Sequence, residues 1–366
     1  MTSSILPVAA LWAALSAMAC SKSPALAMPP PDTGVDADRA ASAVETNAAC
    51  AGCHVEVAAE WRASYHARAA TDPAFQAALA VEPLPFCRGC HAGEAPPGAD
   101  TPADLAALGV ACTTCHSPDR EVLAAPRSAP SLAPHGAPHR TLRAAAFATA
   151  AACAGCHEFD FPDSARRLRP EPMQLTASEH AGSPYAEVAC AGCHMPFAGE
   201  GAARHRSHAF ASRAPGAQAH ALRVRATRTG GAVALTLEPA EIGHAFPTGD
   251  LFRRLSILAE VAGDDGALIA SQSRYLGRHF RQEVAPDGHR ARTTALDDRP
   301  GAPAMDGAPV TVAFDFGRAA CGRPVDVRIA YQRVAHVMDG LESRAAVDSE
   351  VAVFEQSLPD PTRCSP

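Results

Sequence analysis

Large aromatic side chains are scarce in this chain. Of its 366 residues, 2 are Trp, 4 are Tyr and 13 are Phe, so aromatic residues make up only 5% of the sequence. The first half is rich in Ala and Pro and has few large apolar residues of any kind. Such a segment buries a poor hydrophobic core on its own. A stable fold there therefore needs apolar volume from another source.

An excess of positive charge is also absent. The formal net charge is -7 at pH 7, which argues against nucleic acid as a partner. No Gly-rich nucleotide loop, Ser-His-Asp arrangement or basic patch stands out. Long apolar runs are missing apart from Ile5 to Ala19, which is uncharged and too short to span a membrane comfortably.

The run from Ile5 to Ala19 is typical of a signal-peptide core, so we expect residues 1–19 to be a signal peptide and the mature protein to be exported. Ala17-Met18-Ala19-Cys20 resembles a bacterial lipobox, although the usual Leu three residues before the Cys is missing. Lipidation of Cys20 would attach the protein to a membrane in the periplasm or at the outer membrane. The alternative is ordinary cleavage after Ala25-Leu26-Ala27, which discards Cys20.

Five copies of Cys-x-x-Cys-His lie in the first 194 residues. They are Cys50 to His54, Cys87 to His91, Cys112 to His116, Cys153 to His157 and Cys190 to His194. This spacing is the c-type haem attachment signature, in which both thiols form thioethers with one porphyrin and the adjoining His ligates its iron. The thioether-forming residues are then Cys50, Cys53, Cys87, Cys90, Cys112, Cys115, Cys153, Cys156, Cys190 and Cys193. The sequence predicts five covalently attached haem c groups, whose bulk supplies the missing apolar volume.

The alternative for these motifs is a zinc or disulfide scaffold. Zinc sites combine Cys-x-x-Cys pairs two by two, and five pairs do not divide in that way. Three cysteines remain outside the motifs, namely Cys20, Cys321 and Cys364. We expect Cys321 and Cys364 to form a disulfide because the chain is predicted to be exported; two unlinked thiols are the alternative.

The sixth ligand of each iron decides its chemistry, because a second His gives a low-spin centre that only passes electrons. The motif residues His54, His91, His116, His157 and His194 are the expected proximal ligands. Six further histidines lie within the same region: His66, His135, His139, His180, His205 and His208. We expect distal ligands at His66, His139, His180 and His208, with His135 and His205 as their rivals. A fifth is expected at His244, delivered from the C-terminal region.

The chain divides into two parts that differ in composition and in the pattern of apolar and polar residues. Residues 20–43 are expected to be a flexible tether and residues 44–213 a mainly helical and irregular pentahaem domain, with helices near 55–70, 102–108 and 140–154. Residues 214–358 alternate apolar and polar positions between turn signals, for example around Thr229-Gly230-Gly231 and Asp264-Asp265-Gly266. This pattern predicts an all-β antiparallel sandwich, with strands near 222–227, 233–237, 255–261, 310–316, 325–334 and 350–354.

The rest of the C-terminal region carries no predicted haem ligand apart from His244. Residues 359–366 are expected to form a tail. His220, His279, His289 and His336 are expected to be surface or structural residues.

Several of these segments resemble a known family. Cys50 to His54 followed by Trp61, Ser64 and His66-Ala67 is similar to the start of the multihaem cytochromes of the c-554 type, as are Gly109 to His116 and Val188 to Pro196. Gly243-His244 to Thr248-Gly249, with Arg253-Arg254, resembles the sheet domain appended to many bacterial multihaem cytochromes. The resemblance implies closely packed haems, mostly with two His ligands, that shuttle electrons outside the cytoplasm.

We therefore expect an electron carrier rather than a catalyst, one that exchanges electrons with other redox proteins by hopping between neighbouring haems. The alternative is a reductase or oxidase of a small nitrogen or sulfur compound at one haem with an open axial site. A third hypothesis gives the sandwich a docking role.

Overall fold

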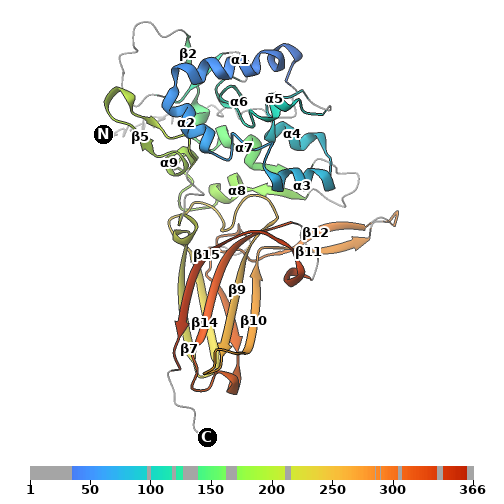
Figure 1. The fold of residues 1–366 in the computed structure, drawn as a ribbon, viewed down its shortest axis with the longest axis vertical. Helices are drawn as coiled ribbons and strands as arrows, with labels where there is room; N and C mark the ends of the chain where they lie inside the picture. The colour runs from blue at the N-terminus through green and yellow to red at the C-terminus, as the bar shows by residue number, and fades with distance from the viewer. Residues whose placement is uncertain are drawn as a thin grey trace, which may run out of the picture.

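The computed structural model describes residues 35–96, 100–117, 121–126, 139–161, 171–210, 216–284, 286–288, 290–303, 307–335 and 341–360. These residues form a helical and irregular part that holds every Cys-x-x-Cys-His motif and a separate part built from long strands (Figure 1). The predicted fold class is confirmed.

The N-terminal part consists of short helices joined by turns. Its described helices are α1 (Ala37–Cys53), α2 (Val55–Ala63), α3 (Pro73–Val81), α4 (Pro85–His91), α5 (Ala103–Ala106), α6 (Cys112–His116), α7 (Ala151–His157), α8 (Thr176–Ala181) and α9 (Cys190–His194). Three two-stranded sheets accompany them: parallel β1 (Val122–Ala124) with β2 (Thr141–Arg143), and antiparallel β3 (Glu158–Asp160) with β4 (Pro172–Leu175) and β5 (Phe197–Ala198) with β6 (His205–Arg206). Apart from α1, these helices are too short to be stable in isolation, and they depend on what they pack against.

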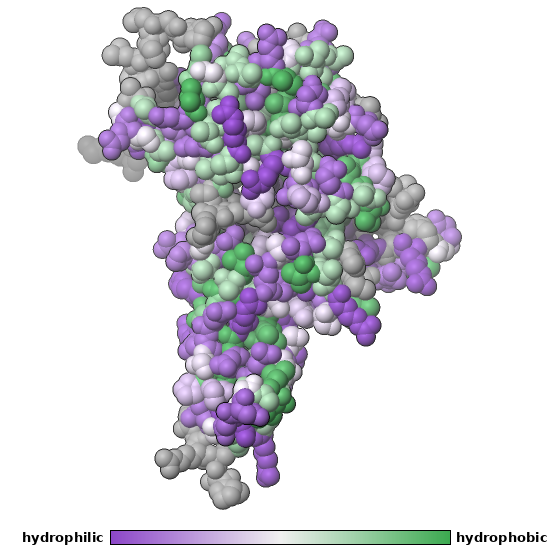
Figure 2. All heavy atoms as spheres, in the orientation of Figure 1, coloured by the Kyte–Doolittle hydropathy of each residue, from purple (hydrophilic) through white to green (hydrophobic). Residues whose placement is uncertain are grey.

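The apolar core of this part is small, as the composition predicts. One buried cluster consists of Ala40, Ala43, Ala70, Ala92, Ala95, Leu105, Leu108 and Ala111. Six of these eight residues are alanines, which bury little area each. Figure 2 shows many weakly hydrophobic residues over this part of the surface, interleaved with polar ones. Protein side chains alone therefore supply little hydrophobic stabilisation here.

The C-terminal part is a two-layered antiparallel sandwich. One sheet has the order β10-β9-β14-β15 and the other has the order β13-β8-β7. The strands are β7 (Leu222–Thr229), β8 (Ala232–Pro239), β9 (Arg253–Ala262), β10 (Leu268–Leu276), β13 (Val310–Asp315), β14 (Val325–Val334) and β15 (Val347–Leu358). A separate hairpin of β11 (Arg278–Val284) and β12 (Arg290–Asp297) projects to one side of the sandwich (Figure 1).

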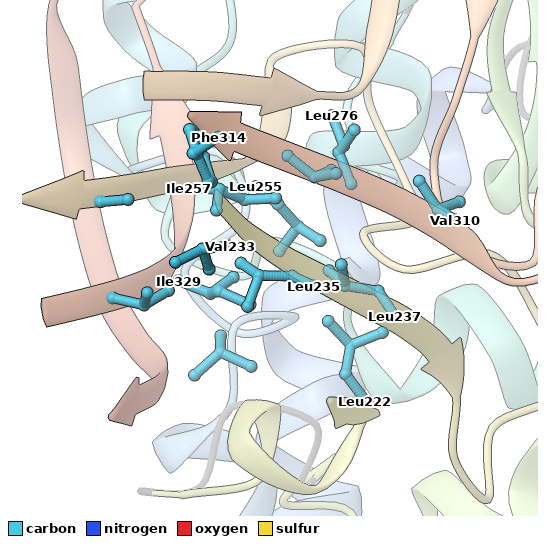
Figure 3. Close-up of a cluster of buried hydrophobic side chains, with 14 of the residues drawn as sticks. Leu222, Val233, Leu235, Leu237, Leu255, Ile257, Leu276, Val310, Phe314 and Ile329 are labelled. Atoms are coloured by element: carbon cyan, nitrogen blue, oxygen red, sulfur yellow. The ribbon is translucent and has the colours of Figure 1, made fainter. Parts of the chain in front are cut away.

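The two sheets enclose a conventional hydrophobic core. Val233, Leu235 and Leu237 alternate along β8, and Leu255 and Ile257 face them from β9; the side chains of all five residues are fully buried. Figure 3 shows these side chains meeting between the layers, together with Ile329 and Phe314. Period-two alternation places every second side chain of a strand in this layer, which is why the pattern predicted the sandwich correctly.

The tether prediction is wrong at its C-terminal end. Helix α1 begins at Ala37, within the segment 20–43 that was expected to be flexible. Asp36 caps the helix by accepting a hydrogen bond from Arg39 N at 2.7 Å. The alanine-rich composition resembles a linker, but Ala40 and Ala43 lie on one buried face and make the segment a packed helix.

Two other helix predictions also need correction. The helix expected over 55–70 ends at Ala63, and turns follow it. The helix expected over 140–154 is replaced by strand β2, a 3₁₀ turn at Ala145–Ala148 and the separate helix α7. Alanine has the highest helix propensity of the amino acids, but propensity is weak compared with tertiary contacts, and pairing of β2 with β1 overrides it here.

The predicted strands of the sandwich are found, with boundaries shifted by a few residues. Strands β10, β11 and β12 were not predicted. Their exposed residues interrupt the alternation; on β10, for example, Leu268 and Ile269 are both exposed. A strand without a consistently buried face leaves little periodic signal in the sequence.

Candidate haem-binding sites

Each Cys-x-x-Cys-His motif lies in or at the end of a short helix. The motif helices are α4, α6, α7 and α9, and the first motif closes α1 with His54 as its C-cap. Residues three apart on a helix share a face, so each motif presents its two thiols to the same side. We number these sites 1 to 5 in chain order. Figure 1 shows α4, α6, α7 and α9 gathered in the same part of the molecule.

Two motif histidines are oriented by backbone carbonyls. His91 Nδ1 lies 2.8 Å from Ala69 O, and His116 Nδ1 lies 2.8 Å from Leu123 O. A proton on Nδ1 that is donated to a carbonyl leaves the lone pair of Nε2 free, and this is the usual arrangement behind a metal-bound His.

Burial keeps several of these rings neutral. It lowers the pKa of His66 and of His194 to about 4 each, with neighbouring histidines adding to the effect. Burial is also the main cause that lowers the pKa of His91, His157 and His208. Neutral imidazole is the form that ligates a metal, so these rings are held in the required state at neutral pH.

Four motif histidines face a second histidine ring across a gap. The separations of the ring centres are 6.3 Å for His54 and His139, 6.3 Å for His66 and His157, 6.0 Å for His116 and His208, and 6.1 Å for His194 and His244. Each pair joins residues that are far apart in the sequence. Each pair also consists of one motif histidine and one histidine expected to be a distal ligand.

These separations can be compared with the distance expected between two histidine rings that bind the same haem iron. Metal–nitrogen bonds are about 2.0–2.1 Å long and an imidazole centre lies about 1 Å beyond its nitrogen, so two rings on opposite sides of one iron have centres about 6 Å apart. All four pairs have this spacing. Paired thiols on one helix face beside each motif His complete the donor set. The residues present therefore fit haem c with two axial histidines at sites 1, 3, 4 and 5.

The rival histidines near site 3 are distinguished by their hydrogen bonds. His208 uses Nδ1 on Arg206 O at 2.8 Å and leaves Nε2 available. His205 is engaged at both nitrogens, with Nδ1 2.8 Å from Ala203 O and Nε2 3.1 Å from Glu60 Oε2. A ring with both nitrogens engaged has no lone pair to offer an iron.

Two residues outside the motifs, Glu60 and Phe210, contact the expected distal ligands His208 and His66. Glu60 on α2 also accepts a hydrogen bond from His208 N at 2.8 Å, although the two residues are 148 positions apart. Phe210 packs edge-on against His66, with ring centres 4.2 Å apart, and has an unusual positive φ of 49°. Neither residue belongs to a motif, so no sequence signal could have identified them.

Site 2 differs from the other four. His91 stacks against Phe75, with ring centres 3.7 Å apart and planes 5° apart. Within the described ranges, no histidine ring faces His91 at the separation of about 6 Å that two ligands of one iron require. His180, the remaining expected distal ligand, packs beside Gly243, where an added Cβ would lie 3.0 Å from His180 Cδ2. The structure thus brings four of the five expected distal histidines opposite a motif His. His180 lies within electrostatic range of His194 but is not a member of these pairs.

The sandwich contributes charged groups near site 2. Asp250 and Arg333 both act electrostatically on His91, and Arg253 acts on His157. Asp250 is bound by Arg253 at 3.1 Å, and Arg253 also donates to the Tyr331 hydroxyl. Burial alone would raise the pKa of Asp250, but Arg253 and Arg333 outweigh it and lower that pKa.

The five motifs lie close to one another through their thiols. Cys153 and Cys190 hydrogen-bond each other, as do Cys90 and Cys156. Cys115 lies within electrostatic range of Cys156, and Cys112 within range of Cys50. These proximities place sites 1, 3, 4 and 5 in one series, with site 2 beside site 4.

The remaining sequence predictions are only partly covered by the described residues. Cys321 is disulfide-bonded, and its expected partner Cys364 lies outside the described residues. Also outside them are the expected signal peptide, Cys20, His135, His289 and His336. His279 binds Asp298 at 3.0 Å and Glu342 at 3.4 Å, as expected of a structural residue. Among the helices that can be described, none is long and apolar enough to cross a bilayer.

Comparison with known proteins identifies the fold. Residues 49–117 match the family described as Cytochrome c554 and c-prime. A penta-heme cytochrome c552 from Thermochromatium tepidum superposes with a TM-score of 0.61 at 18% identity, over 85% of this chain and 97% of that one. The fold is that of a multihaem c-type cytochrome. No curated protein sequence matches this chain.

The match to the c554 family confirms the resemblance to multihaem cytochromes that the short motifs indicated. It covers sites 1 to 3 and His66, but not the two later motifs or the sandwich. The structural likeness extends over both parts of the chain. In the part of the chain that is described, no group of three or more His, Cys, Asp or Glu residues is arranged around a bare metal ion, so the zinc reading gains no support.

Proposed function

We propose that this multihaem cytochrome carries five covalent haem c groups and transfers electrons between redox proteins outside the cytoplasm. The observation that carries the proposal is the set of four histidine pairs with ring centres 6.0 to 6.3 Å apart. Two axial histidines leave an iron no position for substrate, so sites of this kind pass electrons without binding a reactant.

The residues of the chain have three tasks in this function. Each pair of motif thiols would anchor one porphyrin covalently, and the paired histidines would hold its iron. Backbone carbonyls behind His91, His116, His208 and His244 orient the rings. When bound, the haems supply one-electron redox chemistry; the protein sets their spacing, burial and ligands.

The proximity of motif cysteines from different sites supports a continuous route through the protein. Cys50 and Cys112, Cys115 and Cys156, and Cys153 and Cys190 connect sites 1, 3, 4 and 5 in that order. The contact of Cys90 with Cys156 makes site 2 a branch at site 4. We propose that redox partners exchange electrons near sites 1 and 5, the two ends of this series.

Export and membrane attachment belong to the same proposal. Haem c is attached outside the cytoplasm in bacteria, which agrees with the signal peptide expected over residues 1–19. A lipid on Cys20 would hold the protein at the periplasmic face of a membrane, and the negative charge argues for protein partners rather than nucleic acid. The mature N-terminal residue, identified by mass spectrometry, tests this part separately.

Electron paramagnetic resonance of the oxidised holoprotein tests the coordination. The proposal predicts four low-spin signals, and all four should persist when cyanide is added. High-spin signals from two or more of the five irons would contradict it. A redox titration of the same sample should return every low-spin iron to the reduced state reversibly.

A second candidate function rests on site 2. His91 faces no histidine ring within the described part of the chain, and the charged residues Asp250 and Arg333 of the sandwich lie near it. An iron with an open axial position could reduce a small nitrogen or sulfur compound there. A single high-spin iron that binds nitrite, with turnover of nitrite by the reduced protein, would favour this function. If site 2 neither binds nor turns over nitrite, electron transfer is the one function of the two that stands.

A further inference from the structure

A buried carboxylate joins the helical part to the loop that carries His244. Glu179 on α8 has a side chain only 1% exposed. Its Oε2 accepts hydrogen bonds from Ala245 N at 3.2 Å and from Thr248 Oγ1 at 2.6 Å, while its Oε1 binds Arg299 Nη2 at 2.7 Å. Figure 1 shows α8 at the boundary between the helices and the sandwich.

Arg299 completes the arrangement from the sandwich side. Its side chain is 3% exposed, and its Nη1 donates to Pro247 O at 2.7 Å. Asp297 holds the same guanidinium through Nε at 2.7 Å and through Nη2 at 2.6 Å. Phe246 N donates to Pro300 O at 2.9 Å. All four residues from Ala245 to Thr248 are therefore tied, either to Glu179, to Arg299 or to the residue after it.

Close packing restricts the backbone on both sides of His244. A Cβ on Gly301 would lie 3.4 Å from His244 O and 2.9 Å from Pro239 Cγ. A Cβ on Gly243 would lie 3.0 Å from His180 Cδ2 and 3.1 Å from Tyr185 Cβ. A Cβ on Gly301 would therefore clash with Pro239, and one on Gly243 would be unusually tight against His180 and Tyr185, so both glycines allow the loop to pack closely against its neighbours.

The ring of His244 is fixed by the same loop. Its Nδ1 lies 2.9 Å from Ala245 O, and its ring centre lies 6.1 Å from that of His194 with the planes 16° apart. The residue whose amide binds Glu179 is thus the residue whose carbonyl orients the imidazole. A shift of Ala245 would move both contacts together.

We propose that Glu179 and Arg299 form an inter-domain clamp that positions His244 as the distal ligand of site 5. This inference rests on the proposed coordination of site 5 by His194 and His244. It gives the sandwich a role inside the cytochrome: the sixth ligand of one iron is present only when the two parts of the chain are docked. Glu179 acts through the loop and touches no iron ligand side chain, so it is a positioning residue.

The consequence of breaking the clamp follows from burial. Removing the charge of Glu179 leaves the buried Arg299 with Asp297 as its carboxylate partner among the described residues. In either orientation, the amide nitrogen of Gln would face a donor, the guanidinium of Arg299 or the amide of Ala245. The loop would relax away from this arrangement. His244 would then leave its iron more often, and an added ligand could take its place.

The test uses the full-length holoprotein and three variants. Glu179→Gln removes the charge of the clamp with little change in size. Glu171→Gln is the matched control, because Glu171 is also buried, also lies in the helical part and also binds a sandwich arginine, Arg278, at 3.4 Å. Glu171 reaches Thr294 on the hairpin instead of the His244 loop. His244→Ala identifies the spectroscopic signal of site 5.

The measurement is the rate of cyanide binding to the oxidised protein, followed by absorption and by replacement of one bis-histidine low-spin signal by the low-spin signal of a cyanide complex. Loss of a hydrogen bond to a buried charge corresponds to about ten-fold or more in an equilibrium, so we expect Glu179→Gln to speed cyanide binding at site 5 by about ten-fold or more. Glu171→Gln should match the parent protein. Haem content by mass spectrometry, equal in all variants, shows that each has matured.

The outcomes separate the clamp from the proposed function. If His244→Ala opens one iron to cyanide and Glu179→Gln leaves it closed, the clamp is wrong and the coordination stands. If Glu171→Gln opens site 5 as much as Glu179→Gln does, general loosening of the interface explains the effect and the clamp is again wrong. If His244→Ala changes no low-spin signal, the proposed coordination of site 5 fails and the clamp fails with it.

Discussion

At the scale of single residues, hydrogen bonds to the ring nitrogens separate histidines that can bind iron from those that cannot. The sequence offered His205 and His208 as rivals, three positions apart. Of these two, only His208 keeps Nε2 available for iron. Both ring nitrogens of His205 are hydrogen-bonded, Nδ1 to Ala203 O and Nε2 to Glu60. Sequence alone cannot make this choice, because the partner Glu60 lies far away in the chain.

Substitution of the two rivals tests this distinction. We expect His208→Ala to convert one of the five irons from low-spin to high-spin, because site 3 loses its distal ligand. His205→Ala, the matched control, should keep every low-spin signal and lose only a partly exposed ion pair with Glu60. Electron paramagnetic resonance of the oxidised variants measures both. The reverse result would assign the ligand to His205.

His279 gives the sandwich a pH-dependent contribution to stability. Its hydrogen bond to Asp298, reinforced by Glu342, raises its pKa above the usual value. Protonated His279 therefore stabilises the folded state fully below the unfolded pKa of about 6.5, and this contribution disappears as the pH rises through the folded pKa.

The expected size of that effect is modest because the side chain is partly exposed. His279→Gln should destabilise the sandwich by about 0.5–1 kcal/mol at pH 5.5 and by much less at pH 9. Urea unfolding of parent and variant at the two pH values, followed by circular dichroism of the strands, measures this. A larger loss at pH 9 than at pH 5.5 would contradict the account.

At the scale of elements, the motif helices are too short to be stable alone, and neighbouring segments hold them in place. Asn47 on α1 accepts a hydrogen bond from Cys112 N at 3.0 Å, and Arg39 binds the buried Glu94 at 2.8 Å. The turn before α6 binds the His66 segment, where Val110 N donates to His66 O at 2.8 Å. One turn thus connects the thiols of site 3 to His66, the proposed distal ligand of site 4.

Gly109 makes that close approach possible. It has φ +56°, and a Cβ there would lie 2.2 Å from His66 O. We expect Gly109→Ala to lower stability by about 1–3 kcal/mol or more through strain and the clash, and to weaken the low-spin signal of site 4. Thermal melting and paramagnetic resonance of the holoprotein measure both effects.

A matched glycine separates strain from clash. Gly201 has the same φ of +56° but no atom within 4 Å of an added Cβ. Gly201→Ala should therefore cost only the backbone strain, about 1 kcal/mol, and leave site 4 unchanged. Equal effects of the two substitutions would show that the contact with His66 O does not matter.

At the scale of the whole molecule, the two parts differ in what stabilises them. The sandwich has a closed core of Leu, Ile, Val and Phe between two sheets. The helical part has a small cluster made mostly of alanine. Five porphyrins would add the apolar volume that its side chains lack, so its folding should be coupled to haem attachment as that of small metal domains is to their ion.

Protein made without haem attachment tests this coupling. We expect the helical part to remain unfolded and the sandwich strands from Leu222 to Leu358 to form. Limited proteolysis should then digest the first half of the chain and leave a resistant C-terminal fragment, while holoprotein should resist over both parts. A helical part that resists digestion without haem would contradict the prediction.

Features that arise from neighbouring residues in the chain could be predicted from the sequence, and contacts between distant segments could not. The five motifs and the strand alternation are local patterns. The motifs indicated a multihaem cytochrome, which the family match supports, and the alternation predicted the sandwich. Pairings such as His66 with His157 join distant segments, and no spacing rule connects them. His180 precedes the fifth motif closely and was expected to be a ligand, but the structure uses the adjacent Glu179 to hold the loop of His244 opposite site 5.

The central claim is that all five motifs carry covalent haem. Intact-mass measurement of the exported protein, after treatment with a thiol-alkylating reagent, tests it most directly. The account predicts a mass increased by five haems and no alkylation of the ten motif cysteines. A chain of unmodified mass, with those ten thiols alkylated, would contradict it.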